Sequence, residues 1–291
     1  MTYEPDRILL SRLLEALGPQ VTGGIVVNNG INLPLTDAYL LQIGFSAIHL
    51  QSNTGVATAL NTGFEWAESQ GADFVVTFDQ DSEPAYDMVS SLLENYKLLV
   101  ASGKKVGAVG PQQIDRRTGE RTAFIAPISG RRDRVFPAEG TTVEVDHLIT
   151  SGCMVPLEAW KECGRFLDAL FIDYVDIEWC LRLRHGGWHL FGAADAKLQH
   201  SIGDDIKKLG GRRVMWHSPL RHYFVFRNGI YLQKLPHIPL MWKYSDGFQL
   251  IKKFIFFAVA GHPHSVHIMA MLRGIRDGYR SRLGPAPSDR L

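Results

Sequence analysis

Two aspartates separated by one residue could bind a divalent cation. Asp79 and Asp81 follow the apolar run FVVTF (74–78), within the segment FDQDSEP. Side chains two residues apart on a strand point the same way, so both carboxylates can converge on one hard cation beyond the strand end. Oxygen ligands favour Mg²⁺ or Mn²⁺, and such ions usually bridge to a diphosphate. A solvated acidic turn or a helix N-cap is an equally weighted alternative.

A second acidic motif could supply a general base. The run FIDYVDIEWCLRLRHGGW (171–188) holds Asp173, Asp176 and Glu178 before a helical pattern. A base that takes the proton of an attacking hydroxyl must sit beside the reacting centre, and we predict Asp176 in this role. Glu178, Trp179 and Arg182 follow in the same motif and are candidates for contacts to the group that accepts the transfer. The alternative is an acidic helix start whose carboxylate pairs with Arg182.

Three further segments offer weaker candidates. His200 follows an apolar run, and its imidazole could complete the ligand shell of a Mn²⁺ ion. Ser151 and Gly152 in the segment TSG could present backbone N–H groups to a ligand, or form a plain turn. Arg221 and Arg227 lie among aromatic residues in SPLRHYFVFRNG, where they could hold phosphates or the acceptor; an amphipathic core helix is the favoured alternative.

Helices and strands that alternate along the chain must position these residues. Periodic and short apolar runs predict an α/β domain with a mostly parallel sheet flanked by helices, and ligands bind beyond the carboxyl ends of strands in such sheets. Residues 112–150 are predicted to be less regular, with exposed turns or a loop over the site. The predicted helices are 7–17, 54–70, 85–100 and 175–186, and the predicted strands are 21–29, 46–51, 74–78, 106–111 and 188–193.

Composition limits the class of protein. The 291 residues suit one large domain or one domain with an appendage, and a net charge of +1 argues against bulk nucleic-acid binding. Three cysteines without metal-type spacing favour free thiols in a reducing compartment. The first twenty residues show no secretion signal, and no apolar run reaches the ~20 residues of a spanning helix. We therefore expect a cytoplasmic protein.

The last segment differs in character from the rest. Residues 236–291 hold eight Lys or Arg against three Asp, together with several aromatic residues. Such a pattern at helical spacing fits an interfacial helix on the inner face of an anionic membrane, and a helical cap on the main domain is the equal alternative. We expect a main domain at 1–235 and a C-terminal helical segment at 236–291.

The motifs and their order resemble the family 2 glycosyltransferases of GT-A fold, and within them the bacterial rhamnosyltransferases of O-antigen and exopolysaccharide assembly. The resemblance covers most of residues 1–232. The matching stretches are TYEPD (2–6), LLEALGPQV (13–21), IVVNNG (25–30), NTGVATALNTGFEWA (53–67), FVVTFDQDSEP (74–84), TSGCMV (150–155), FIDYVDIEWCLR (171–182), HSIGD (200–204) and SPLRHYFVFRNGIYL (218–232).

This resemblance implies a donor, a reaction and residue roles. The donor would be dTDP-β-L-rhamnose, and a single inverting displacement would give an α-L-rhamnoside on a saccharide acceptor that could be lipid-linked. Asp79 and Asp81 would form the metal-binding DxD motif, Asp176 the catalytic base and His200 a further metal ligand. The positions that match those around the nucleotide are Tyr3, Asn28, Asn53 and Gly55.

The chain departs from the family at its beginning. Members have a full apolar strand before their Thr-Tyr-Asn-Pro segment, whereas Met1 stands beside the matching segment here. We expect either a start further upstream or a shortened first strand that weakens the sheet and the base pocket. Glu4 replaces the usual Asn. Asn28 replaces an Asp, so a hydrogen bond to the base would lack charge assistance.

Two other readings stay open at this point. A phosphatase of the haloacid dehalogenase type also places DxD after a strand, with the first Asp as nucleophile. Its DxD normally stands near the start of the chain, which disfavours this reading. A catalytically weak relative that binds a glycan or a partner is the non-enzymatic reading, and the intact acidic motifs argue against it.

Overall fold

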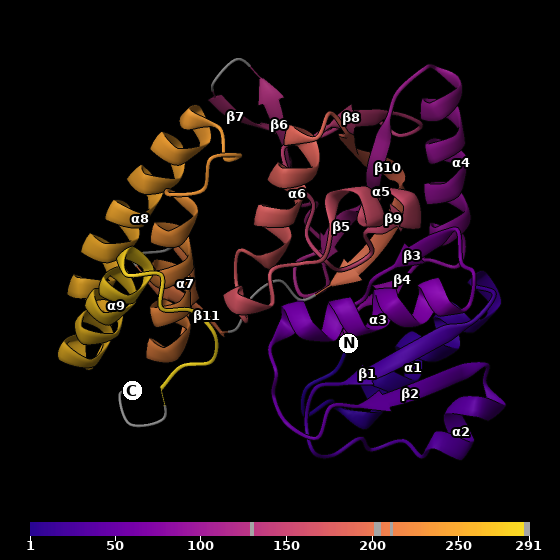
Figure 1. The fold of residues 1–291 in the computed structure, drawn as a ribbon, viewed down its shortest axis with the longest axis horizontal. Helices are drawn as coiled ribbons and strands as arrows, with labels where there is room; N and C mark the ends of the chain where they lie inside the picture. Colours follow the sequence, from indigo (N-terminus) through magenta and orange to yellow (C-terminus); the bar gives the residue numbers. More distant parts are fainter. Residues whose placement is uncertain (129–130, 201–204, 210–211, 288–291) are drawn as a thin grey trace.

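The computed structural model describes residues 1–128, 131–200, 205–209 and 212–287. Helices and strands alternate through the first half, as the sequence predicts, and a helical layer forms the C-terminal end (Figure 1). The first elements are α1 (Arg7–Leu17), β1 (Gly24–Asn28), α2 (Asp37–Gln42), β2 (Phe45–His49), α3 (Val56–Ser69), β3 (Phe74–Val76), β4 (Glu83–Pro84), α4 (Met88–Ala101) and β5 (Val106–Asp115). The later ones are β6 (Phe124–Ile128), β7 (Arg131–Val135), β8 (Thr142–Glu144), β9 (Met154–Pro156), α5 (Leu157–Cys163), α6 (Val175–His185), β10 (His189–His200), β11 (Asp205–Leu209), β12 (Arg212–Trp216), α7 (Pro219–Leu232), α8 (Leu240–Ala260) and α9 (His264–Tyr279).

The central sheet is mixed rather than mostly parallel, which corrects the prediction. Its order is β3-β9-β5-β10-β4, with β8 also paired to β10. β5 and β10 are parallel, but β9 inserts antiparallel between β3 and β5. The three apolar residues of β9 follow the irregular middle of the chain, where no periodic pattern announces a strand. The α/β class itself is confirmed.

Two hydrophobic cores lie on opposite faces of this sheet. The consecutive residues Leu190 and Phe191 of β10 belong to different buried clusters, because neighbouring side chains of a strand point to opposite faces. One core includes residues of α3, α5 and α6, and the other includes residues of α1 and α4. The middle of the chain adds the antiparallel β6–β7 hairpin, a more regular structure than the sequence predicts.

The C-terminal helices α7, α8 and α9 form a layer beside the sheet (Figure 1). α7 and α9 approach closely at two glycines. A Cβ on Gly274 would lie 2.4 Å from the carbonyl oxygen of Tyr223, and one on Gly278 would lie 2.2 Å from that of Arg227. Helices α8 and α9 confirm the helical character predicted for residues 236–291. The predicted boundary between residues 235 and 236 falls between α7 and α8. None of the helices described is long and apolar enough to cross a membrane.

A cavity separates the first two strands from the central sheet. Among the residues described, β1 pairs in parallel with β2, and β3 pairs with β9. A cavity of about 690 Å³ lies between the free edges of β1 and β3, lined by side chains such as Leu14, Val27, Phe64 and Val76. Thr2 reaches its mouth, forms a parallel bridge to Asn28 and donates its N–H to the carbonyl of Val27 at 2.9 Å.

We expect an apolar strand added before Met1 to fill this cavity. The bridge at Thr2 fixes the register, so the added residues would continue parallel to β1 and β3. Each apolar side chain buried there contributes about 1.5–3 kcal/mol, against about 1–2 kcal/mol for ordering each backbone residue. Five added Val and Ile residues are expected to raise Tm by several degrees, measured by calorimetry. Five added Gly and Ser residues are the control, and equal Tm values for both additions would contradict the expectation.

Candidate active site

The turn that carries Asp79 and Asp81 is fixed by a buried serine. Ser151 is fully buried, and its Oγ accepts the N–H of Asp79 at 3.3 Å. The hydroxyls of Ser151 and Ser82 lie 2.5 Å apart, and the N–H of Ser82 donates to the carbonyl of Asp79 at 3.2 Å. These bonds fix the turn, so the hydroxyl of Ser151 positions the carboxylates, and the predicted contact of its backbone N–H to a ligand stays a prediction.

Gly152, the residue after Ser151, helps to hold the same turn through its backbone. The N–H of Gly152 donates to the carbonyl of Thr77 at 2.6 Å, so it is not available to a ligand as the sequence analysis proposed. Gly152 has φ +80°, and a Cβ there would lie 2.5 Å from Cγ of Pro111. Any side chain would therefore clash with β5 and displace the 150–152 segment that supports the acidic turn.

The loop before α6 is held in an unusual backbone conformation. Phe171, Asp173 and Tyr174 have φ values of +67°, +60° and +64°. Such residues cost about 1–3 kcal/mol each and persist only where the surroundings hold them. Nδ2 of Asn228, a buried residue of α7, contacts the carbonyl oxygens of Ile172 and Asp173 at 2.7 and 2.9 Å. Its amide fixes the chain direction just before the predicted base, a role that its sequence position did not reveal.

Asp176 lies at the start of α6 as a carboxylate with raised basicity. Its Oδ1 accepts the N–H of Ile177 at 2.8 Å. Burial raises the pKa of Asp176 to about 6; the hydrogen bond from Ile177 opposes this shift, and the charges of Asp173 and Asp79 add to it. Asp79 lies near enough to Asp176 to raise its pKa, so the two acidic motifs belong to one site. A carboxylate with a pKa near 6 is ionised at neutral pH and still able to accept a proton.

The residues predicted around the nucleotide gather near the ends of β1 and β2. The N–H of Tyr3 donates to Oε1 of Gln80, the residue between the two aspartates, at 2.7 Å. Oδ1 of Asn53 accepts the N–H of Gly55 at 3.1 Å. Asn28 is fully buried, with Nδ2 3.4 Å from Nδ1 of His49. Asn28 thus lies behind this surface, whereas half of Tyr3 is exposed on it.

Gly55 connects the nucleotide side to the loop that leads to the base. Its φ is +91°, and a Cβ would lie 2.7 Å from the carbonyl oxygen of Phe171. The next residue, Val56, donates its N–H to that same oxygen at 2.6 Å. The start of α3 and the strained loop are therefore joined by a contact that only glycine permits.

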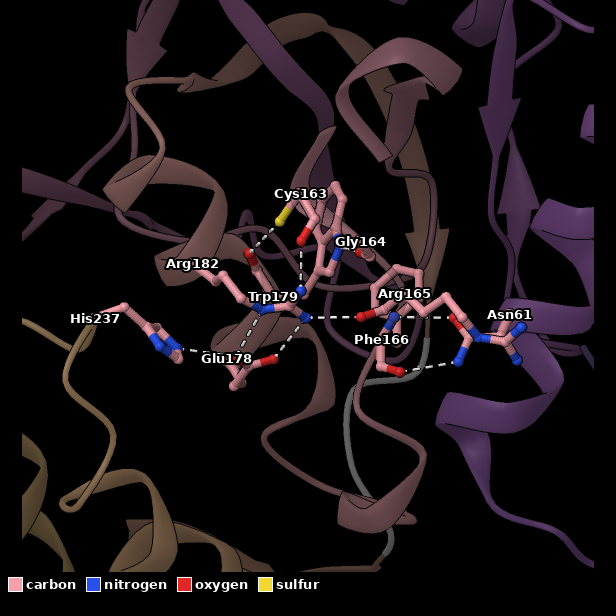
Figure 2. A network of polar contacts seen from close by, with 9 residues as sticks. All are labelled: Asn61, Cys163, Gly164, Arg165, Phe166, Glu178, Trp179, Arg182 and His237. Atoms are coloured by element: carbon pink, nitrogen blue, oxygen red, sulfur yellow. Dashed lines mark hydrogen bonds and ion pairs between the residues drawn. The ribbon is translucent and has the colours of Figure 1, made fainter. Parts of the chain in front are cut away.

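The acidic and basic residues that follow Asp176 form a structural network instead of an acceptor surface (Figure 2). Glu178 is fully buried, and its two oxygens accept from Arg182 at 2.9 and 3.1 Å. Arg182 also donates to the carbonyl of Cys163 at 2.6 Å. Nε2 of His237 lies 2.9 Å from Glu178, within ion-pair distance but without hydrogen-bond geometry. This placement supports the alternative reading of the motif, with Glu178 as the carboxylate that pairs with Arg182.

Trp179 belongs to the same network. Its indole N–H donates to the carbonyl of Gly164 at 2.9 Å, and its ring is buried. Asn61 of α3 exchanges two 2.9 Å hydrogen bonds with the backbone of Phe166 (Figure 2). The predicted contacts of Glu178, Trp179 and Arg182 to an acceptor are therefore corrected: these side chains hold α6 against the 163–166 loop.

Replacing Glu178 with Gln is expected to destabilise the fold. The change leaves the guanidinium of Arg182 partly buried without its carboxylate, and breaking such a pair costs about 3 kcal/mol. The matched control is Glu65→Gln, because Glu65 pairs with Arg165 between half-exposed side chains, and such a surface pair contributes less than about 1 kcal/mol. Urea unfolding of both variants measures the difference. Equal free energies of unfolding for the two variants would contradict a structural role of Glu178.

The two arginines of α7 have different roles. Arg221 is one-third exposed, and its Nη2 lies 3.2 Å from Oδ1 of Asp173, so it stays a candidate for binding phosphate or acceptor. Arg227 is fully buried and donates to the carbonyls of Leu170 and Gly284. Its predicted phosphate contact is corrected, because the guanidinium ties the strained loop to the C-terminal layer.

The remaining predicted metal ligand is only partly described. The backbone of His200 ends β10 opposite Asp115, and its side chain lies outside the described residues. Across the described part of the chain, no group of three or more His, Cys, Asp or Glu side chains could hold a metal ion. The three cysteines are free thiols, and burial raises the pKa of Cys153 to about 12.

Comparison with known proteins defines the class. The family described as "Glycosyl transferase family 2" matches residues 10–144. A curated relative is 32% identical over 289 residues, which is 95% of this chain and 94% of that protein. The chain belongs to the family 2 glycosyltransferases and is a glycosyltransferase, so the phosphatase reading is wrong.

The individual relatives refine this result. The curated relative is the dTDP-rhamnosyl transferase RfbF of Shigella flexneri, which confirms the resemblance to the rhamnosyltransferase subgroup. The fold is similar to that of S. aureus TarS residues 1–349 in complex with UDP-GlcNAc, with a TM-score of 0.56 and 12% identity over 94% of this chain and 78% of that one. It is also similar to GalNAc-T7 with UDP, GalNAc and Mn²⁺, with a TM-score of 0.54 and 12% identity over 89% of this chain and 57% of that one.

Proposed function

We propose that this glycosyltransferase moves L-rhamnose from dTDP-β-L-rhamnose to a saccharide acceptor, with inversion, in the synthesis of a bacterial cell-surface polysaccharide such as O-antigen or exopolysaccharide. The observation that carries the reaction type is Asp176, a carboxylate with its pKa raised to about 6 within the electrostatic reach of Asp79. The donor is supported by the 32% identity to a dTDP-rhamnosyl transferase.

A divalent cation, Mg²⁺ or Mn²⁺, fits the acidic turn. Asp79 and Asp81 offer hard oxygen ligands, and Mg²⁺ is commonly held by one or two carboxylates together with substrate phosphates. The charges of Asp79 and Asp173 already oppose ionisation of Asp176, so the site concentrates negative charge that a cation would compensate. The Mn²⁺ named for GalNAc-T7 agrees with this choice. When bound, the ion would neutralise the diphosphate as it leaves.

The side chains of the protein carry out proton transfer and position the donor and the acceptor. Asp176 takes the proton of an acceptor hydroxyl, whose oxygen attacks the anomeric carbon from the face opposite the diphosphate. The bond between that carbon and the diphosphate oxygen breaks, which inverts the anomeric centre. Tyr3 and Asn53 flank the nucleotide. Arg221 lies beside Asp173, where it can orient the diphosphate or the acceptor.

The proposed setting is the cytoplasm, at the inner face of the cytoplasmic membrane, with an acceptor that is saccharide and lipid-linked. Three free thiols fit a reducing compartment. The formal net charge of +1 supports no nucleic-acid partner.

The donor is tested by thermal stabilisation of the purified protein. A ligand that binds only the folded state raises Tm, so dTDP-rhamnose is compared with UDP-glucose and GDP-mannose, with and without Mn²⁺. A Mn²⁺-dependent shift with dTDP-rhamnose alone is expected. A shift with another donor instead would reject rhamnose as the transferred sugar. Binding without turnover in an acceptor screen would favour the weak, glycan-binding reading.

A further inference from the structure

The outward face of α8 carries a continuous apolar stripe. Six residues spaced three or four apart share this face, each with 56% to 74% of its surface exposed: Leu240, Tyr244, Phe248, Ile251, Ile255 and Val259. We call these six residues the outer stripe. At a rise of ~1.5 Å per residue it is about 30 Å long. Scattered exposed apolar residues are ordinary, but a contiguous row of this length marks an interaction surface.

The opposite face of α8 already supplies its packing in the fold. Trp242, Leu250 and Phe257 are buried in the hydrophobic core that also includes residues of α3, α5 and α6. The outer stripe is therefore not needed to hold the helix in place. Its apolar character calls for a partner outside the chain.

The charges of α8 indicate the nature of that partner. Its charged residues are Lys243, Lys252, Lys253 and Asp246, and Asp246 is buried. Nζ of Lys252 lies 4.4 Å from the ring centroid of Phe248, so this lysine runs along the stripe and ends at its edge. Lys253 lies on the inner face near Asp246, and burial lowers the pKa of its ammonium. The charge beside the outer stripe is that of Lys243 and Lys252, and it is positive.

We propose that α8 lies in the surface of an anionic lipid membrane, with the outer stripe in the acyl boundary and Lys243 and Lys252 at the headgroups. A basic amphipathic helix binds in this way, and each lysine near an anionic surface contributes about 1 kcal/mol. A second copy of the chain is disfavoured, because symmetric pairing of two such faces would bring lysines together without exposed α8 carboxylates to match them.

The inner face of α8 also contacts the residue that precedes α6, the helix of the predicted base. Asp246, on the inner face of α8, accepts a 3.1 Å hydrogen bond from the hydroxyl of Tyr174. Tyr174 precedes α6 and stands two residues before Asp176. Docking would therefore hold the site close to the membrane surface, where a lipid-linked acceptor is presented; this consequence rests on the proposed function, whereas lipid binding does not.

Vesicle co-sedimentation of the full chain tests the proposal. We expect binding to vesicles that mix phosphatidylglycerol with phosphatidylcholine, weakened by salt, and at least tenfold weaker binding to phosphatidylcholine alone. The double variant Phe248→Ser, Ile255→Ser is expected to lose at least tenfold in affinity, and Lys252→Glu to weaken binding only to the anionic vesicles. The matched control is Leu98→Ser, Val100→Ser, which removes two exposed apolar residues of α4 and should bind as the wild type does.

Circular dichroism and Tm show that each variant is folded, and light scattering reports its oligomeric state. Unchanged vesicle binding by the folded double variant would overturn the proposal. A wild-type dimer that the double variant abolishes, without binding to anionic vesicles, would assign the stripe to a second copy instead. The donor-induced Tm shift, measured on the same proteins, separates the two hypotheses, because its failure would leave lipid binding untouched.

Discussion

Replacing Asp176 with asparagine is expected to reduce turnover by roughly 10²–10⁴, the usual contribution of a general base. The amide keeps the shape of the side chain but cannot take the proton of the acceptor hydroxyl. Binding of the donor should change little, because Asp176 acts on the hydroxyl of the acceptor and not on the donor. Initial rates with saturating donor measure the loss, and the donor-induced Tm shift measures binding. Asp73→Asn is the matched control, since Asp73 is exposed and precedes β3 at the end opposite Asp79.

The same substitution should stabilise the folded protein, which a structural carboxylate would not do. Burial raises the pKa of Asp176 from 3.8 to about 6, so ionisation is harder in the folded state than in the unfolded chain. Wild-type stability is therefore lost as pH rises from about 4 to 6, by up to about 3 kcal/mol for about two pKa units. Above pH 6 in EDTA the asparagine variant should be the more stable protein, and below pH 4 the difference should vanish. A less stable variant at pH 7.5 would make Asp176 a structural residue.

The pH profile adds an independent check on the base. Because only the ionised carboxylate accepts the proton, kcat/KM of the wild type should fall as pH drops below about 6. The residual rate of the asparagine variant should lack this limb. A profile that is flat between pH 5 and 8 would assign proton transfer to another group.

The sequence determined the alternation of helices and strands and located both acidic motifs, because those signals are local. The runs around β1, β2, β3 and β5 are short and apolar, and the strand assigned to each is confirmed with small shifts at the ends. β9 escaped prediction because its three residues form a strand only by inserting between β3 and β5. β4 and β8 also pair antiparallel with β10, and the local periodicity of the sequence records none of these pairings.

The roles of polar residues were harder to predict, because burial depends on the tertiary fold. Glu178 and Arg227 carry charges typical of a ligand site, yet both are fully buried and bound to other parts of the chain. Ser151 and Asn228 hold the two motifs in place through backbone contacts that their neighbours in sequence do not announce. Only Glu178 gave a usable signal, its spacing of four residues from Arg182 on a helix.

Replacing Asp81 with asparagine is expected to abolish the Mn²⁺-dependent part of donor binding. An amide is neutral and a weaker ligand for a hard cation, so the diphosphate would lose a charge stabilisation of several kcal/mol, equivalent to roughly 10²-fold or more in kcat/KM. The Tm shift produced by dTDP-rhamnose with Mn²⁺ should fall to the shift produced by dTDP-rhamnose alone.

The matched control for Asp81 is Ser151→Ala, which leaves both carboxylates in place but removes the hydroxyl that accepts the N–H of Asp79. That variant should lose stability by about 1–3 kcal/mol, since it leaves buried polar groups without a partner, and yet keep a Mn²⁺-dependent Tm shift. The two variants therefore separate a metal ligand from the support that positions it. If Asp81→Asn keeps the full Mn²⁺-dependent shift, the cation is held without Asp81, and the acidic turn only shapes the entrance to the site.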